Sequence, residues 1–385
     1  MTASLPASIT TPTTVLSATP TNSQTSPDDP APEPPVSTLR PPHDPAPEPP
    51  ELRPKRADLF EMTFVGDMIF GRYRTDGFDP IAEDGFDVFA PTRALLDAHL
   101  VVGNLETPLA FELPQKSPIA SPFRFGASAQ MAQHLARAGF DAVSVANNHA
   151  YDLRRAGLEQ TPRILAALGI VGLGSVPDEP PTVRVQTVER EGWRIGFVAV
   201  ATRLNGPRPR GLPSIPLVPT RELDDRVIPL VRRARASHDL IVVLVHWGEE
   251  GRRTPTAAQR FVAHQLVDAG VDLVVGHHPH VLQGIESYHG GVIAYSMGNF
   301  LFDNVNEIPR QTGVLRIRAR GRECLNAVVF HPVLIEPTPV EHPVPAPGAR
   351  GQPVKQRLQT LSEPWGTHWR DEGDALVLDP LACPS

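Results

Sequence analysis

Short apolar segments recur through the middle of the chain, and they limit its possible folds more than any other feature. Leu240–His246 and Leu273–Gly276 contain almost no polar residue before their last position. Such segments are typical of strands that are covered on both faces. Between them lie longer segments in which apolar residues recur at helical spacing, for example Thr256–Asp268. The alternation predicts an α/β fold in which helices lie outside layers of strands.

The predicted strands share a high content of aliphatic residues and end in Gly or a polar residue. They are Met62–Val65, Val101–Gly103, Ala142–Ala146, Arg194–Ala199, Leu240–His246, Leu273–Gly276, Val292–Ser296 and Val314–Ala319. The predicted helices are Ala127–Ala138, Ala156–Leu168, Glu222–Ala236 and Thr256–Asp268. The region after Gly313 is strand-like and can complete a second sheet, and the next helical pattern is Val354–Leu361. The last segment, to Ser385, has no clear pattern.

The distribution of proline along the chain predicts its division into domains. Many of its 44 Pro residues lie before Leu59 or after Pro332, and the heptapeptide of residues 29–35 recurs at 44–50. Proline at this density blocks helices and sheet ladders. We predict a disordered Pro-rich tail over residues 1–56, a globular domain over 57–336, and a loop and C-terminal extension over 337–385 that packs on the domain. The tail is best read as a spacer, with a ligand for a Pro-recognising partner as the alternative.

Composition excludes several classes of protein. The formal net charge of −7 argues against a nucleic-acid binder, whose affinity comes from Lys and Arg on phosphates. The two cysteines, Cys324 and Cys383, are too few for a disulfide framework or a Cys-type zinc site. No apolar run approaches the ~18–20 residues of a membrane span, and the N-terminus does not resemble a signal peptide. We therefore expect a soluble protein, by default cytoplasmic; the sequence does not predict its oligomeric state.

Metal-competent residues follow one predicted strand after another. They are Asp67, Glu106, the pair Asn148-His149, His246, and the run His277-His278-Pro279-His280. Ligands of open α/β sheets bind outside the carboxyl ends of the strands. One polar residue after a strand is most often a cap or a turn former, but five such strand ends in one chain indicate a shared site.

The predicted ligand set contains only oxygen and nitrogen donors. Such a set suits Zn²⁺, Mn²⁺ or Fe²⁺ and disfavours soft metals. We predict one or two divalent ions, held by Asp67, Glu106, Asn148, His246, His278 and His280. His278 and His280 alternate along what we expect to be extended chain, so both would point the same way, and His277 would point oppositely and support the ligands.

The order and spacing of these motifs resemble those of a known family across roughly residues 60–305. The motifs are Gly66-Asp67, Asn104-Leu105-Glu106, Asn147-Asn148-His149-Ala150, His246-Trp247-Gly248-Glu249-Glu250, Gly276-His277-His278-Pro279-His280 and Tyr295-Ser296-Met297-Gly298-Asn299-Phe300. They look like the CapA-type poly-γ-glutamate (capsule) synthesis family. That family is similar in fold to the calcineurin-like metallophosphoesterases, so the resemblance implies a four-layer αββα sandwich.

The resemblance also implies a role for each matched residue. Asp67 would hold the first metal, Glu106 would take the bridging-carboxylate position, and Asn148 would ligate the second metal. The three histidines would complete the metal shells; they are His246, His278 and His280. The Asp-x-His opening of the phosphoesterases is absent here, and Glu106 stands where they usually have Asp.

Two further residues are predicted to carry the acid–base chemistry. His149 would protonate the leaving group, with Asp152 fixing its tautomer; a helix N-cap is an equally good interpretation of Asp152. Residues predicted to bind substrate or to support the ligands are Asn104, Glu249, His277 and Asn299. For Glu249 a solvated loop, and for Asn299 a turn, are the alternatives.

These predictions lead to two functions. The first is a metal-dependent hydrolase in which activated water attacks a phosphoester or a γ-glutamyl-type amide. The second is a non-catalytic component of capsule synthesis or export that binds an anionic polymer in the same pocket. Members of the capsule family are usually membrane-anchored, and the absence of an anchor pattern here favours a soluble relative with its own substrate. Either function implies an anionic small molecule or polymer as the partner.

Overall fold

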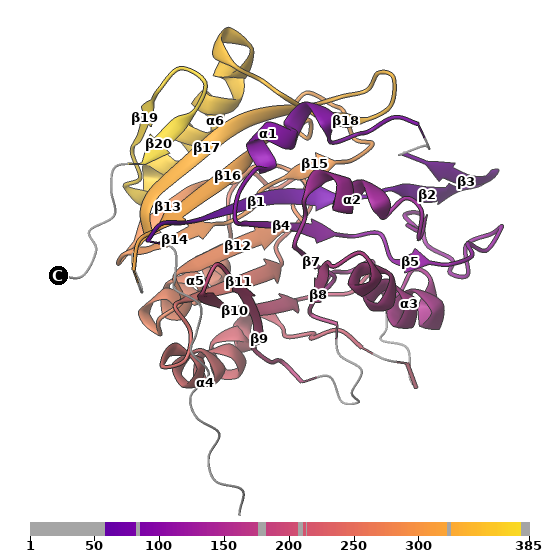
Figure 1. The fold of residues 1–385 in the computed structure, drawn as a ribbon, viewed down its shortest axis with the longest axis horizontal. Coiled ribbons are helices and arrows are strands. Elements are labelled where there is room, and N and C mark those ends of the chain that lie inside the picture. Colours follow the sequence, from indigo (N-terminus) through magenta and orange to yellow (C-terminus); the bar gives the residue numbers. More distant parts are fainter. Residues whose placement is uncertain are drawn as a thin grey trace, which may run out of the picture. The chain divides into compact units, whose positions relative to one another are not determined.

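Two β-sheets and the helices on their outer faces make up the part of the chain that the computed structural model describes (Figure 1). The described residues are 58–81, 85–175, 182–206, 211–212, 214–321 and 325–378. The predicted Pro-rich tail over residues 1–56 lies outside them, as do Cys324 and Cys383. The domain boundaries predicted from composition therefore stay a prediction.

The first sheet combines strands from both ends of the described chain. Its order is β19-β20-β17-β16-β1-β4-β7-β8, with β15 paired to β1 and β18 to β17. Its strands are β1 (Phe60–Met68), β4 (Leu100–Leu105), β7 (Ala142–Ser144), β8 (Val171–Leu173), β15 (Asn299–Leu301), β16 (Gln311–Ala319), β17 (Leu325–Glu336), β18 (His342–Pro345), β19 (Trp369–Asp371) and β20 (Leu376–Leu378). Strands β1, β4, β7 and β8 are parallel, whereas β16 runs antiparallel to β1. The strand-like region after Gly313 therefore extends the sheet of the N-terminal strands, and the prediction that it can complete a second sheet is wrong.

The second sheet comes from the middle of the chain. Its order is β13-β14-β12-β11-β10-β9. Its strands are β9 (Gln186–Arg190), β10 (Trp193–Ala201), β11 (Leu240–His246), β12 (Leu273–His277), β13 (Ile285–Tyr288) and β14 (Gly291–Ala294). The four central strands are parallel. Two small ribbons complete the strands: β2 (Gly71–Arg74) with β3 (Gly77–Pro80), and β5 (Leu109–Ala110) with β6 (Ala127–Ser128).

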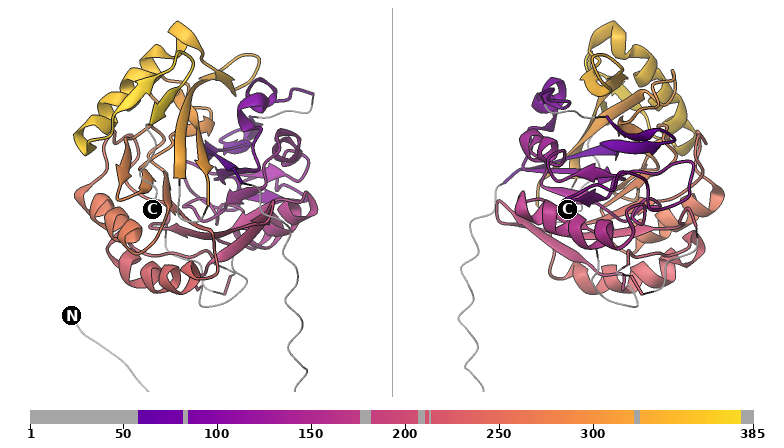
Figure 2. Two further views of the ribbon diagram at one scale, coloured as in Figure 1. Left: turned by 60° about the vertical axis from the view of Figure 1, so that its left-hand side comes forward. Right: turned by 90° about the vertical axis from the view of Figure 1, so that its right-hand side faces the viewer.

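Most helices cover the outer faces of the sheets, as Figure 2 shows, whereas the helix over residues 352–362 packs Val354 and Leu358 into the core between the sheets. The α-helices are α1 (Arg93–Leu96), α2 (Gln133–Ala138), α3 (Arg154–Ala167), α4 (Leu223–Arg235), α5 (Ala257–Asp268) and α6 (Gln352–Ser362). The short 3₁₀ helices are η1 (Ala90–Thr92), η2 (Thr220–Glu222), η3 (Gly348–Gly351) and η4 (Glu363–Trp365). No helix in the described ranges combines the length and the apolar character needed to cross a membrane.

Strand β11 shows how the layers follow from the sequence. Leu240, Val242 and Leu244 lie in the core between the two sheets, where they meet residues of β1 and β4. The alternate residues Ile241 and Val243 pack against α4 and α5 on the other face. Because successive side chains of a strand point to opposite faces, a strand buried on both sides must be apolar throughout. This arrangement confirms the predicted four-layer αββα sandwich.

Two local predictions differ from the structure. The helix predicted from Ala127 begins only at Gln133, because Ala127–Ser128 pairs as strand β6 with β5. The last segment, which had no clear pattern, forms the antiparallel strands β19 and β20. In both places pairing with another strand, β5 for Ala127–Ser128 and β17 for β20, supplies backbone hydrogen bonds that the local sequence pattern does not reveal.

Candidate metal centre

The predicted site residues lie where the carboxyl ends of the two sheets meet. In the first sheet Asp67 is in register with Asn104 on one side and with Asn299 on the other. In the second sheet His246, the last residue of β11, is in register with His277 of β12. The parallel pairing therefore brings residues from distant motifs to one edge, as the strand-end rule predicts.

Two glycines allow the strands to approach one another at this edge. A Cβ atom at Gly66 would lie 2.1 Å from the carbonyl oxygen of Gly298, and one at Gly276 would lie 2.0 Å from that of Tyr295. A side chain at either position would overlap the neighbouring backbone, so only glycine fits. Glycine thus precedes both Asp67 and His277 because the site is assembled from closely packed strands.

Asp67 lies at the centre of the site and is fully buried. Its Oδ1 accepts a hydrogen bond from Asn104 Nδ2 at 2.8 Å, and its Oδ2 accepts one from the backbone N–H of His278 at 3.1 Å. Oδ2 also lies 3.2 Å from Nδ1 of His280. Burial raises the pKa of the Asp67 carboxyl, but the hydrogen bond and charge of His280 outweigh it and leave the pKa below its usual value. Asp67 is therefore an anion at neutral pH.

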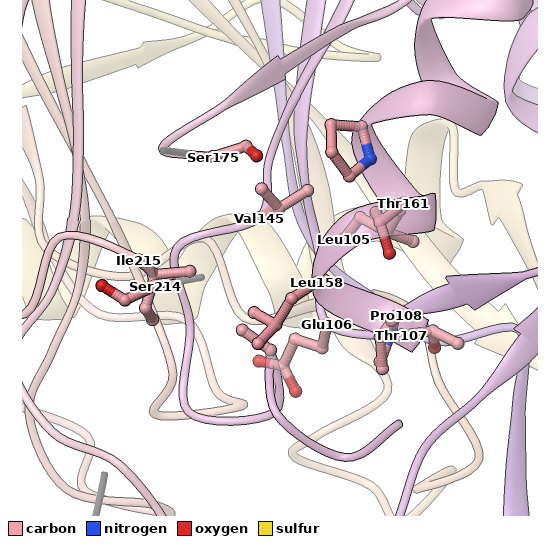
Figure 3. A pocket seen from close by; sticks show the side chains of 13 residues that line it. Leu105, Glu106, Thr107, Pro108, Val145, Leu158, Thr161, Ser175, Ser214 and Ile215 are labelled. Carbon is pink, nitrogen blue, oxygen red and sulfur yellow. The ribbon is translucent and has the colours of Figure 1, made fainter. Parts of the chain in front are cut away.

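Glu106 is equally buried, yet neither of its carboxylate oxygens has a hydrogen-bond partner among the described residues. Oε1 lies 3.6 Å from Nε2 of His246. Figure 3 shows Glu106 with Leu158 and Ile215 around a small pocket that has room, about 20 Å³, for little more than one water. Burial, and then the charge of Asp67, raises the pKa of Glu106 well above its usual value. A buried carboxyl without a donor is costly unless a cation lies beside it.

His246 and His278 are the neutral imidazoles of the site. Burial, and then the neighbouring His278, lowers the pKa of His246 well below its usual value. Burial, and then His280, lowers the pKa of His278 to about 3. Nε2 of His246 lies 2.6 Å from Oδ1 of Asn148, whereas neither ring nitrogen of His278 has a hydrogen-bond partner among the described residues. Neutral imidazole is the form that ligates a metal.

His280 differs from the other two histidines because it lies beside the carboxylates. Burial lowers the pKa of its imidazole, but the charge of Glu106 and the hydrogen bond to Asp67 outweigh burial and raise the pKa to about 10. Its Nδ1 also lies 2.9 Å from Oδ1 of Asn299. Without a metal, His280 is therefore the cation that balances the buried acids.

The predicted geometry of the His277–His280 segment is wrong. Strand β12 ends at His277, and the φ angles of His278 and His280 are +99° and +57°, so the chain turns and is not extended. His277 is still directed away from the ligands, with Nε2 3.2 Å from the carbonyl oxygen of Val65. The turn nevertheless brings both following histidines into the site.

The potential ligand atoms form two groups. Within each group, all ligand atoms lie within 4.8 Å of one another. The first contains Asp67, Glu106 and His280, and the second contains Glu250, His278 and His280. Unpartnered buried atoms on Glu106 and His278, together with an oxygen and nitrogen donor set, fit a divalent ion of the Mn, Fe or Zn type.

His149 and Asp152 form a buried pair next to these groups. Nδ1 of His149 lies 2.7 Å from Oδ2 of Asp152, and that oxygen also accepts the backbone N–H of Phe125 at 2.8 Å. The alternative role of Asp152 as a helix cap is wrong, because α3 has Leu153 as its N-cap and no capping side chain. Asp152 therefore orients the imidazole of His149, whose ring lies 4.1 Å from that of Phe125.

Two residues near the site differ from the predicted set. Glu249 is exposed and its carboxylate lies 3.2 Å from Arg252, whereas its neighbour Glu250 is the one grouped with His278 and His280. Asn205 was not predicted at all, although its Oδ1 accepts a hydrogen bond from Nδ2 of Asn148 at 2.8 Å. Its loop has no apolar pattern and no motif, so only the folded arrangement reveals it.

A cleft of about 450 Å³ opens beside the site. His149, His280 and Glu250 line it, together with Arg72, which forms an ion pair with Asp303. The volume lies in the range of small-molecule sites. A substrate in this cleft would reach both the predicted acid and the predicted metal ligands.

Comparison with known sequences places these motifs in a family. Residues 61–304 match the family described as bacterial capsule synthesis protein PGA_cap. The chain is 29% identical over 332 residues to the PGA biosynthesis protein CapA of Bacillus subtilis, covering 84% of this chain and 83% of that protein. It is 32% identical over 305 residues to the capsule biosynthesis protein CapA of Bacillus anthracis, covering 75% and 71%. These matches confirm the resemblance drawn from the motifs.

Solved structures with a related arrangement of elements include a nucleotidase and a phosphoesterase. The 5'-nucleotidase precursor from Thermus thermophilus aligns with a TM-score of 0.42 at 15% identity, over 80% of this chain and 59% of that one. The calcineurin-like phosphoesterase YfkN from Bacillus subtilis aligns with a TM-score of 0.32 at 10% identity, over 79% and 96%.

Proposed function

The chain belongs to the bacterial capsule synthesis protein family PGA_cap, and on that premise we propose that it is a metal-dependent hydrolase of a phosphoester or a γ-glutamyl-type amide. One observation carries the proposal. Glu106 and His278 are buried at the site with no hydrogen-bond partner for either carboxylate oxygen or either ring nitrogen among the described residues. Unpartnered buried groups of this kind are costly unless a ligand satisfies them.

The residues that would hold the metal are those predicted from the sequence. Asp67 and Glu106 would supply carboxylate oxygens, Asn148 would supply an amide oxygen, and three imidazoles would complete the set, those of His246, His278 and His280. A divalent ion bound there acts as a Lewis acid and lowers the pKa of water toward neutrality. His280 must lose its proton before it can join the set, since its pKa in the metal-free protein is about 10.

We expect His149 to donate a proton to the leaving group. Asp152 accepts a hydrogen bond from Nδ1, so Nε2 is the ring nitrogen through which His149 can exchange a proton with a substrate. His149 lines the cleft, and both side chains of the pair are buried. General acid catalysis of this kind contributes about 10²–10⁴-fold.

The second candidate is a component of capsule synthesis that binds an anionic polymer without cleaving it. It is favoured by the names of the curated relatives, which are PGA and capsule biosynthesis proteins. A second cavity of about 390 Å³ shares Ser121 and Asn205 with the cleft, and the two together would accommodate more than one unit of a chain. This function requires the same pocket but no acid at His149.

Metal content tests the proposal before any substrate is chosen. Purified protein should hold Mn, Fe or Zn in near-stoichiometric amounts by elemental analysis, and His278→Ala should lose it. His289→Ala is the matched control, because this histidine is exposed and its Nδ1 pairs with Asp268 at 2.7 Å. Wild-type protein that remains metal-free after incubation with all three metals contradicts the hydrolase.

Activity then separates the two candidates. The metal-loaded protein should hydrolyse p-nitrophenyl phosphate, bis-p-nitrophenyl phosphate or poly-γ-glutamate, and His149→Ala should slow it about 10²–10⁴-fold. If the loaded protein is inert toward all three, and His149→Ala changes only the binding of poly-γ-glutamate, the polymer-binding function replaces the hydrolase.

A further inference from the structure

We infer that Asn205 is a positioning residue of the metal site, which ties the predicted ligand Asn148 and the predicted acid His149 to a single side-chain amide. The inference rests on the proposed function, because it concerns how one ligand of that metal is oriented. Asn205 lies in the loop after β10, far in sequence from the strand-end motifs, and no family motif quoted above includes it.

The first step concerns the amide of Asn148. Nδ2 of Asn148 donates to Oδ1 of Asn205 at 2.8 Å, and its Oδ1 lies 2.6 Å from Nε2 of His246 at the centre of the site. The oxygen and nitrogen ends of an amide are nearly the same size, but only the oxygen binds a hard cation. By accepting from the nitrogen end, Asn205 keeps the oxygen end directed at the metal ligands.

The second step concerns His149. Nδ2 of Asn205 lies 3.3 Å from Nε2 and 3.5 Å from Nδ1 of that ring. The same amide therefore contacts the predicted acid with its nitrogen and the predicted ligand with its oxygen. Because Asp152 holds the other side of the imidazole at 2.7 Å, His149 is held between a fixed carboxylate and Asn205.

Asn205 also lies on the path that a substrate would take between two cavities. Asn205 is exposed, and together with Ser121 it lines both the cavity beside His149 and His280 and the cavity beside Asn148 and Tyr151. It therefore lies where the two cavities adjoin. A substrate that extends from one cavity into the other must pass Asn205, so the amide of Asn205 can also contact the substrate.

Two nearly isosteric substitutions separate the hydrogen bond from the shape of the side chain. Asn205→Leu removes both contacts, while Asn205→Asp keeps an acceptor for Asn148 Nδ2 and loses the amide nitrogen that lies 3.3 Å from Nε2 of His149. Residues that support metal ligands typically change affinity about 10–100-fold when removed. Isothermal titration with Mn²⁺ should therefore show at least about tenfold weaker binding for Asn205→Leu and near wild-type or tighter binding for Asn205→Asp.

A second variant controls for the charge that Asp adds. A Cβ atom at Gly206 meets nothing within 4 Å, so Gly206→Asp places a carboxylate in the same loop without the hydrogen bond to Asn148. The double variant Asn205→Leu/Gly206→Asp should bind Mn²⁺ as weakly as Asn205→Leu. Recovery to the level of Asn205→Asp would show that charge alone is sufficient and would overturn the inference.

The remaining outcomes are also decisive. If Asn205→Leu binds Mn²⁺ as wild type does, Asn205 does not position Asn148, and the proposed hydrolase stands without this inference. If wild-type protein binds no Mn²⁺, Fe²⁺ or Zn²⁺, the proposed function fails first and the inference fails with it. Wild type and Asn205→Leu should unfold at the same temperature in the metal-free state, because Asn205 is an exposed loop residue. Equal unfolding temperatures exclude a general loss of structure as the cause of weaker metal binding.

Discussion

The edge of the first sheet that reaches the site differs in chemistry from the facing edge of the second. The first sheet and the segments after its strands supply oxygen donors, two of them carboxylates, from Asp67, Glu106 and Asn148. The second supplies imidazoles, from His246 at the end of β11 and from His278 and His280 after β12. Each edge alone is incomplete, since the acids repel one another and the imidazole of His278 has no hydrogen-bond partner among the described residues.

The pKa values show what the two edges do to each other. The carboxylates raise the pKa of His280 to about 10, while burial lowers that of His278 to about 3. In the metal-free protein one proton on His280 balances the acids of the first sheet. A divalent ion would replace this proton and would also satisfy the imidazole of His278, which has no hydrogen-bond partner among the described residues. Predictions that disturb one edge at a time test this division.

Removing the charge of Asp67 should have the largest effect. Asp67→Asn keeps the shape of the side chain but deprives the first sheet of its central anion, which contacts Asn104, His278 and His280. We expect elemental analysis to find no stoichiometric metal in this variant. Asp268→Asn, at a half-exposed carboxylate paired with His289, is the control and should keep its metal; metal retained by Asp67→Asn would contradict a central role for the first sheet.

Removing one imidazole from the second sheet should have the next largest effect. His246→Ala takes away a neutral donor and leaves Asn148 Oδ1 and Glu106 Oε1 without their neighbour. Because a direct ligand contributes more than a supporting residue, Mn²⁺ affinity should fall by more than about tenfold. An affinity equal to that of wild type in calorimetric titration would remove His246 from the ligand set.

The exchange of a proton for a metal predicts a pH dependence. His280 has a raised pKa of about 10, so it is protonated throughout the neutral range in the metal-free protein and must become neutral to bind a metal. Metal affinity should therefore rise with pH between about 6 and 8, by about tenfold per unit for each proton released. Calorimetry in buffers of different ionisation enthalpy counts the protons that the protein releases when the metal binds. If no proton is released, a proton on His280 does not balance the acids of the first sheet.

The smallest effect should distinguish two neighbouring carboxylates at the mouth of the site. Glu250→Gln should weaken metal binding by a few-fold, on the order of the ~1 kcal/mol of a solvent-exposed charge pair, because Glu250 is grouped with His278 and His280. Glu249→Gln should leave the affinity unchanged, since Glu249 is exposed and paired with Arg252. If Glu249→Gln weakens metal binding more than Glu250→Gln in the same titration, Glu249 is the residue near the metal, as predicted from the sequence.

The sequence by itself determined the layers and most of the donor types. Burial on both faces forces β11 and β12 to be apolar, and polar residues lie at or after the ends of β1, β7 and β11, so local patterns single out Asp67, Asn148 and His246 as candidates. The αββα order followed from the same alternation together with the family resemblance.

Only the tertiary structure decided which donors meet. The turn at His278 and His280, the choice of Glu250 over Glu249, and the position of Asn205 all depend on contacts between residues far apart in the chain. The bond from the His278 N–H to Asp67 spans 211 positions. Periodicity indicates whether a residue is buried within its own strand. The packing of the two sheets against each other depends on the whole chain, and no local pattern predicts it.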